Sequence, residues 1–439
     1  MKIIYEKKSY KWLPFKYLSI YILVLLFLSI CGPIKFEYEP LSLVLMVIYI
    51  LAFLLFTWIG MSSTCMYTPP CFAKNIQEIK LLKVLKFLIV ITLPIKVMLV
   101  ISSIRIMGMP SVTNFFATLA TVYTDMHNAE SFTNLYRQID TFCTVIFYFS
   151  TFAGLFWRKK LSVIFRTIIF ANVILDLFYQ LCFIGTQRSI ITVAVLLLTL
   201  FLTSAITKNY QIDKKKLLKI VIVIVMLLIV FLNILSARQS LWNTGGAYYA
   251  PNDNFNYESL WLIWCRTDKL KYNVCNLLSY FTQGFYGLTL SFQMPFQWTG
   301  MLGSVRGLNS IISQIFSFIP DMGDCTYPVR AGIQFHHDGY AYWYTTFPWL
   351  ASDLTFFGAL IYMGIVGRFF MRCWIQTVRY NNPIAFSVLV LLIIQYIFII
   401  ANNQLFVQRG ESLATVILII VYYIFAKKFN FDKTNQENS

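Results

Sequence analysis

Ten apolar stretches, each close in length to the thickness of a bilayer, limit what this chain can fold into. A transmembrane α-helix needs about 20 mostly apolar residues, and a backbone inside hydrocarbon must satisfy its hydrogen bonds within the protein. The sequence therefore predicts an all-α integral membrane protein with about ten transmembrane helices. A composition of 58% hydrophobic and 13% charged residues is typical of that class. The predicted spans are 15–32, 41–61, 87–106, 139–156, 161–180, 188–206, 217–236, 349–371, 382–401 and 412–428.

Lys and Arg are sorted by type between the two sides of the predicted bundle. With a cytoplasmic N-terminus, the inner loops and span ends hold 23 of the 36 Lys and Arg residues, and 19 of these are Lys. The outer loops and span ends hold 11, of which eight are Arg. Because positive charge collects on the cytoplasmic side of membrane proteins, we expect both termini to be cytoplasmic. The excess of outer Arg indicates a face that holds an anion, since a guanidinium binds phosphate or carboxylate through two parallel hydrogen bonds.

One outer loop of 112 residues separates seven predicted spans from three. A loop this long is usually functional or has its own structure. Its segment 276–294 is apolar but interrupted by Gly284 and Gly287, which predicts an interfacial or re-entrant helix rather than an eleventh span. A second such element is expected at 311–319. The predicted parts are a seven-helix N-terminal membrane part (1–236), the large extracytoplasmic loop (237–348), a three-helix C-terminal membrane part (349–428) and a cytoplasmic tail (429–439).

The large loop is rich in aromatic residues and carries as many acidic as basic side chains. Pyranose rings stack their C–H faces on Trp and Tyr, so this composition suits a sugar ligand. The alternative is that the aromatic residues only anchor the loop at the lipid headgroups, where Trp and Tyr are enriched.

Arg188 lies in the sequence Gly-Thr-Gln-Arg-Ser (185–189), between the fifth and sixth predicted spans. A tight turn there makes Arg188 open the sixth helix, where unpaired backbone N–H groups point outward. A helix N-terminus together with a guanidinium is a suitable site for a phosphate. The alternative is an Arg that extends from a span end toward the membrane surface.

Lys96 and Asp176 fall within predicted spans, where charged groups are costly and usually face a cavity or one another. A buried Lys96–Asp176 ion pair that holds helices together is the favoured interpretation. The lining of a cavity for a lipid phosphate is the alternative.

Candidate bases occur in and after the large loop. His336, His337 and Asp338 are consecutive, so a histidine oriented by a carboxylate could accept a proton. Asp353, one turn inside the eighth predicted span, could do the same. No third ligand accompanies the histidines, so neither a metal nor another cofactor is expected.

Three segments resemble the bacterial O-antigen and capsule oligosaccharide repeat-unit polymerases, which are related to the O-antigen ligases. Two of them read FTQGFYGLTLSFQMPFQW (281–298) and WLASDLTFFGALIYMGIVG (349–367), and the third is the Arg188 turn, which is similar to the Arg turn of the ligases. The arrangement of many spans around one large outer loop also fits these families.

The resemblance implies a membrane glycosyltransferase of the bacterial plasma membrane, acting on its outer side. It would transfer a growing glycan from polyprenyl diphosphate to the terminal sugar of a new lipid-linked repeat unit, without a metal. Its partners would be the lipid-linked oligosaccharide, the bilayer, and possible chain-length regulators and flippases, but no nucleic acid. Alternatives are another polyprenyl-dependent transferase, an O-antigen ligase, or a lipid-linked-sugar transporter. By this resemblance, the diphosphate would be bound by Arg188 and, from location alone, by Arg238, Arg266, Arg306, Arg330 and Arg409.

Overall fold

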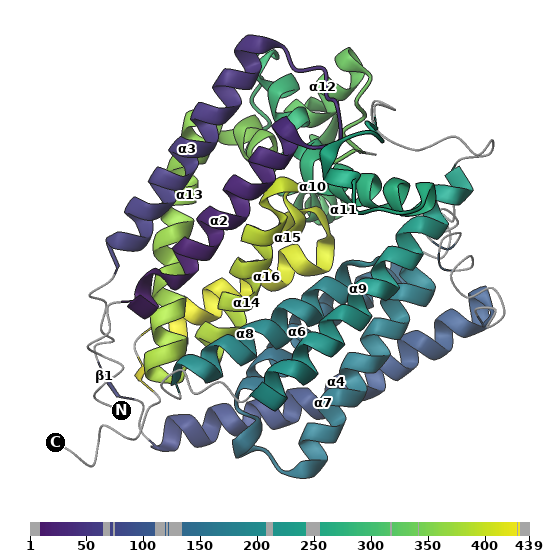
Figure 1. Ribbon diagram of the computed structural model, residues 1–439. Helices are drawn as coiled ribbons and strands as arrows, with labels where there is room; N and C mark the ends of the chain where they lie inside the picture. Colours follow the sequence, from purple (N-terminus) through teal and green to yellow (C-terminus); the bar gives the residue numbers. More distant parts are fainter. Residues whose placement is uncertain are drawn as a thin grey trace.

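The protein is a bundle of helices, ten of which are long and apolar enough to cross a membrane within the described part of the chain (Figure 1). Each of the ten overlaps one predicted span, so the prediction of an all-α multi-pass membrane protein is confirmed. The computed structural model describes residues 9–64, 71–72, 75–109, 119, 122, 134–207, 214–242, 255–316, 318–340, 342–427 and 429–430.

The ten long apolar helices are joined by short helices and turns. Each helix that crosses the bundle contains one of the ten candidate spans, and α7, α14 and α16 are extended by a further turn of π- or 3₁₀-helix. The helices that contain the spans are α2 (Ser9–Cys31), α3 (Pro40–Ser62), α4 (Asn75–Met107), α6 (Asn134–Phe156), α7 (Val163–Tyr179), α8 (Arg188–Thr207), α9 (Lys214–Trp242), α13 (Thr346–Tyr380), α14 (Pro383–Ile397) and α16 (Arg409–Val421). One further long helix, α10 (Asp268–Phe292), contains none of the ten candidate spans. The shorter elements are β1 (Cys71–Phe72), η1 (Arg158–Lys160), η2 (Gln180–Ile184), η3 (Leu260–Leu262), α11 (Arg306–Ile315), η4 (Gly323–Cys325), α12 (Tyr327–Phe335), η5 (Phe398–Ile400), α15 (Gln404–Val407), η6 (Tyr422–Ala426) and β2 (Phe429–Asn430).

The segments β1 and β2 bring distant parts of the chain to one end of the bundle. Cys71 pairs with Phe429 and Phe72 with Asn430, in parallel. The connection after α3 and the segment after α16 therefore lie on the same side, as the predicted assignment of both to the cytoplasm requires.

Helices α3 and α13 pack closely along their length, as the left part of Figure 1 shows. A Cβ atom on Gly60 would lie 1.9 Å from the backbone oxygen of Gly364, and one on Gly367 would lie 2.8 Å from the backbone oxygen of Thr57. Small residues let two backbones approach in a membrane, where packing rather than water exclusion holds helices together. Substitution of Gly60 would force these two helices apart.

Helix α13 is broken near its N-terminal end. Thr355 has φ 64° and ψ 165°, so the chain forms a short helical piece up to Leu354 and a longer piece that crosses the bundle. Neighbours bind the backbone at the break: Tyr49 Oη donates to the Phe356 carbonyl at 2.8 Å, and the Gly358 N–H donates to Thr355 Oγ1 at 3.3 Å. Irregular backbone at membrane depth is tolerated when protein groups satisfy it in this way.

Helix α10 enters the bundle from the end that carries α11 and α12, and its second half lies inside the bundle. Its second half is buried against α2 and α3, and the Phe292 ring lies 5.6 Å from the Tyr49 ring of α3. A Cβ atom on Gly284 would lie 1.9 Å from the Ile400 carbonyl oxygen, so only glycine fits this contact. The second half of the segment predicted as interfacial or re-entrant is thus buried by other parts of the protein. Of the element expected at 311–319, residues 311–315 form the end of α11, which packs against α16.

Candidate functional site

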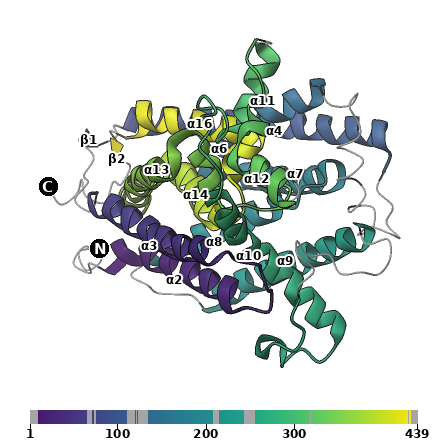
Figure 2. The same ribbon diagram turned by 90° about the horizontal axis from the view of Figure 1, so that it is seen from above.

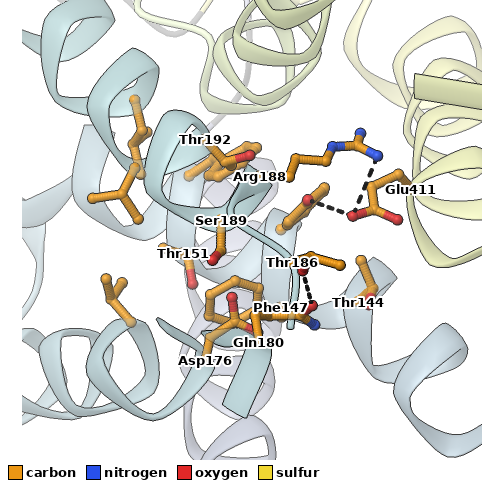
Figure 3. Close-up of a pocket in the computed structure, with 15 residues that line it drawn as sticks. Thr144, Phe147, Thr151, Asp176, Gln180, Thr186, Arg188, Ser189, Thr192 and Glu411 are labelled. Carbon is orange, nitrogen blue, oxygen red and sulfur yellow. Dashed lines mark hydrogen bonds and ion pairs between the residues drawn. The ribbon is translucent and has the colours of Figure 1, made fainter. Parts of the chain in front are cut away.

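A polar pocket lies among α6, the end of α7, the start of α8 and the first turn of α16 (Figure 3). The chain alternates direction from span to span, so this pocket lies at the end of the bundle that carries α10, α11 and α12. The enclosed space is about 30 Å³, room for about one water molecule, so a larger ligand requires side chains to move. The lining residues are Thr144, Phe147, Tyr148, Thr151, Phe152, Val173, Asp176, Gln180, Thr186, Arg188, Ser189, Thr192, Val193, Leu196 and Glu411.

The turn before α8 places Arg188 at the pocket. Gly185 ends the π-helical turn η2 with φ 71°, a conformation that glycine adopts without strain. The Thr186 N–H donates to the Gln180 carbonyl at 2.9 Å, and Thr186 Oγ1 to Gln180 Oε1 at 3.0 Å. The chain therefore reverses within three residues, and Arg188 is the first residue of α8, as the sequence predicted.

The Arg188 side chain is only 10% exposed, yet its guanidinium has few partners among the described protein groups. Its closest ionic partner is Glu411, with 3.6 Å between Nη1 and Oε1. Considering all described residues, Nε, Nη1 and Nη2 of Arg188 make no hydrogen bond, and neither do the buried hydroxyls of Thr151 and Ser189. Buried donors normally find an acceptor, so this set of donors indicates a ligand that accepts hydrogen bonds.

Glu411 reaches the pocket from the first turn of α16. Tyr148 Oη donates to Glu411 Oε1 at 3.4 Å, a long hydrogen bond, and the Glu411 side chain is 18% exposed. Neither Glu411 nor Tyr148 was predicted to have a role. Glu411 could have been noticed in the sequence as an acidic residue at the start of the tenth span. Arg409, two residues away, suggested a local ion pair instead.

A second buried cation, Lys96, lies deeper in the bundle. Its Nζ is 2.6 Å from Asp176 Oδ1 and 3.3 Å from Asp140 Oδ1, and it sits over the rings of Phe147 and Tyr179. The expected Lys96–Asp176 ion pair is therefore present, and Asp140 is a partner that the sequence did not indicate. Asp176 also lines the pocket, on the side away from Glu411 in Figure 3.

The histidines predicted as bases lie outside this pocket, at the C-terminal end of α12. His336 is exposed and ends the helix with φ 56°. His337 is 2% exposed, with its ring stacked 4.7 Å from Tyr342 and its edges against Tyr286 and Tyr344. Burial lowers the pKa of the His337 imidazole to about 4, so this side chain is neutral at neutral pH. Asp338 accepts a hydrogen bond from the Tyr340 N–H at 2.8 Å, which makes it part of a turn.

Asp353 holds a loop against α13. Thr299 Oγ1 donates to one carboxylate oxygen, and the Ser304 N–H donates to the other at 2.7 Å. The side chain is buried, so both oxygens are already occupied by protein donors. This geometry explains an acidic residue at a span end by its structural role, without a role in proton transfer.

The other arginines predicted to bind the diphosphate lie in several different segments. Arg306 lies between the rings of Tyr340 and Trp349, at 4.6 and 5.2 Å from their centroids, and burial lowers its pKa. Arg330 donates to the carbonyl oxygens of Cys325 and Pro295, and Arg409 donates to Ser310 and Gln314. Arg266 is exposed, and the side chain of Arg238 lies outside the described residues. The four arginines of this set whose side chains the structure describes, Arg266, Arg306, Arg330 and Arg409, do not line the Arg188 pocket.

Across the described ranges, no group of three or more His, Cys, Asp or Glu side chains is arranged to hold a metal ion. Comparisons with protein-family models, with curated proteins and with solved structures found no match to this chain. The features that bear on function are therefore the chemistry of the pocket and the resemblance of the three segments described above.

Proposed function

We propose that the protein is a polymerase of lipid-linked oligosaccharide repeat units. It transfers the growing glycan from polyprenyl diphosphate to the terminal sugar of a new lipid-linked repeat unit, on the outer side of a bacterial plasma membrane. The family resemblance supports this proposal, and so does a pocket among membrane helices that presents hydrogen-bond donors around an arginine.

The observation that carries the proposal is the state of Arg188. A guanidinium that is nine-tenths buried costs free energy when its donors stay unpaired. Glu411 is near Nη1 of Arg188, which leaves the Nε and Nη2 donors available to a second anion. Two adjacent guanidinium donors fit two oxygens of one phosphate, and the N-terminus of α8 adds favourable electrostatics.

The position of the pocket suits a lipid diphosphate. Its walls are spanning helices, so a polyprenyl chain can lie along the bundle while its headgroup reaches Arg188. The diphosphate leaves the anomeric carbon with the electron pair of the broken C–O bond. A fixed cation beside the leaving oxygen stabilises that charge as it develops, which is the largest single contribution in many enzymes.

We assign proton acceptance to Glu411. Asp176 is held by Lys96 at 2.6 Å, and both oxygens of Asp353 are occupied by protein donors. Among the described residues, Glu411 makes only long contacts, to Tyr148 and Arg188, and it adjoins the proposed phosphate position. The acceptor hydroxyl oxygen bonds to the anomeric carbon, and its proton passes to the Glu411 carboxylate.

The test uses purified protein in proteoliposomes with lipid-linked repeat units as the only substrate. Polymer on a gel is expected from the wild type, and Arg188→Lys should lose most of it, because a point charge cannot reproduce a bidentate contact. The matched control is Arg166→Lys, the same change at the other end of α7, where Arg166 Nε donates to the Leu161 carbonyl.

Two results would contradict the proposal. Normal polymer from Arg188→Lys would remove Arg188 from phosphate binding. Absence of polymer from the wild type, combined with movement of the lipid-linked unit across the bilayer, would identify a transporter.

A further inference from the structure

The segment Leu260–Trp264 presents a short apolar surface on the outer part of the molecule. Its sequence is Leu-Trp-Leu-Ile-Trp, and Leu260, Ile263 and Trp264 are 81%, 75% and 63% exposed. Contiguous exposed apolar side chains on a protein mark a surface that contacts another protein, a ligand or a membrane. Within the chain, this segment lies just before α10, whose first turns project from the bundle on the side opposite α11 (Figure 2).

The segment is attached to the outer end of α2. Trp261 Nε1 donates to the Cys31 carbonyl at 2.7 Å, which binds one of the last carbonyl groups of that helix. The Trp261 ring meets the Phe27 ring edge-on, with 6.0 Å between centroids. Phe27 is itself 53% exposed on α2, so Trp261 continues the outer surface of a spanning helix.

The exposed face of α2 is the lipid-facing face of a span. Its exposed side chains recur every three or four residues, at Tyr17, Ile20, Val24 and Phe27. This spacing places them on one side of the helix. The apolar surface of Leu260–Trp264 is therefore continuous with a surface that faces acyl chains.

The inner side of the segment is packed and fixed. Leu262 is 1% exposed and forms a small cluster with Cys265, Cys275 and Phe255. Phe255 forms a bridge with Ile34, just beyond α2. A segment held from beneath in this way cannot bury its exposed residues by turning over.

We propose that Leu260, Ile263 and Trp264 insert into the outer leaflet of the bilayer beside α2, at the level of the lipid headgroups and upper acyl chains. Tryptophan is enriched at that level because its ring is apolar and its N–H is polar. Arg266, which is exposed directly after the segment, lies where it contacts lipid phosphates. The insertion fixes the start of α10 at the membrane surface. This proposal does not depend on which reaction the protein performs.

The test measures tryptophan fluorescence of the full-length protein in vesicles of phosphatidylethanolamine and phosphatidylglycerol. The spectrum of Trp264→Phe subtracted from that of the wild type isolates Trp264. This difference signal is expected to be quenched strongly by lipids brominated near the upper acyl chain and weakly by aqueous acrylamide. The substitution removes an exposed side chain, so the fold is retained. Trp58→Phe calibrates the signal of a lipid-exposed tryptophan, because Trp58 is 44% exposed on α3.

Two results would overturn the proposal. Quenching by acrylamide but not by brominated lipid would place Trp264 in water. Quenching by neither reagent would mean that protein covers the segment, in a second copy or another partner.

Discussion

Two buried cations in the same bundle, Lys96 and Arg188, differ in how completely protein groups pair with them. Lys96 has two carboxylate partners, at 2.6 and 3.3 Å, and two aromatic rings around its ammonium group. Arg188 has one carboxylate at 3.6 Å, and none of its three side-chain nitrogens makes a hydrogen bond to the described residues. Both lie near Asp176, which pairs with Lys96 and lines the pocket of Arg188.

This difference separates a structural charge from one that is available to a ligand. Removing a charge from water costs several kcal/mol per ion, and nearby opposite charges recover that cost only when their geometry is good. Lys96 meets this condition within the protein and so joins α4, α6 and α7. Arg188 does not meet it, so a bound anion would supply the negative charge and the hydrogen-bond acceptors that the described protein groups do not.

The largest expected effect is on stability, at Lys96. Lys96→Met leaves Asp140 and Asp176 buried without their cation, which should lower the free energy of unfolding by about 3–5 kcal/mol. Thermal unfolding of the purified protein in detergent measures this loss. The matched control is Lys160→Met, which breaks the partly exposed pair with Glu78 and should cost less than about 1 kcal/mol. Equal losses from both variants would show that the buried ion pairs of Lys96 stabilise the fold no more than the partly exposed pair of Lys160.

The next effect is on transfer, at Arg188. Arg188→Met should lower the rate of glycan transfer about 10²- to 10³-fold, the usual cost of removing one donor to developing negative charge. Its stability should stay within about 1 kcal/mol of the wild type, because few native contacts are lost. Rate and unfolding temperature measured on the same preparation compare it directly with Lys96→Met. A stability loss as large as at Lys96 would make Arg188 structural.

A smaller loss of rate is expected at Glu411. Glu411→Gln should reduce transfer about 10²-fold while binding of the lipid diphosphate is retained, since the amide cannot take the proton. Glu78→Gln makes the same change in the pair with Lys160 at the far end of the bundle and is the control. An unchanged rate with Glu411→Gln would exclude it as the base but leave the role of Arg188 standing.

The smallest effect concerns a buried group that stays neutral, His337. Its pKa of about 4 lies below the ordinary value near 6.5, so below pH 6.5 the unfolded chain binds a proton that the folded protein does not. Stability should therefore fall as the pH drops from about 6.5 to about 4, by about 2 kcal/mol at pH 5. His337→Phe should flatten this dependence, whereas His336→Asn, an exposed position, should not. Equal pH dependence in both variants would contradict this account.

Much of the fold followed from the sequence because length and hydropathy define a span locally. The break in α13 did not, because Leu354-Thr355-Phe356 contains neither glycine nor proline, and its stability depends on Tyr49 from another helix. The burial of α10 was also hidden. Gly284 and Gly287 interrupt its apolar pattern, and the same interruption is compatible with a helix on the membrane surface.

The site was predictable only where one segment carried the signal. Arg188 stood out as a charged residue in a tight turn, and Lys96 and Asp176 as charges within apolar stretches. Glu411 and Tyr148 are 263 residues apart and have a shared role only because α16 packs against α6. The roles of His337 and Asp353 could not be predicted for the same reason, because residues from several elements surround them.

The unfilled donors around Arg188 have a practical consequence for finding the natural substrate. By mass action, a ligand that binds only the folded protein raises its stability, by about 2.7 kcal/mol at a concentration one hundred times its Kd. A polyprenyl diphosphate without any sugar should already raise the unfolding temperature of this protein, and the increase should vanish in Arg188→Met. Carriers with different glycans can then be ranked by the additional increase that each gives, so the saccharide can be identified before any polymer is made.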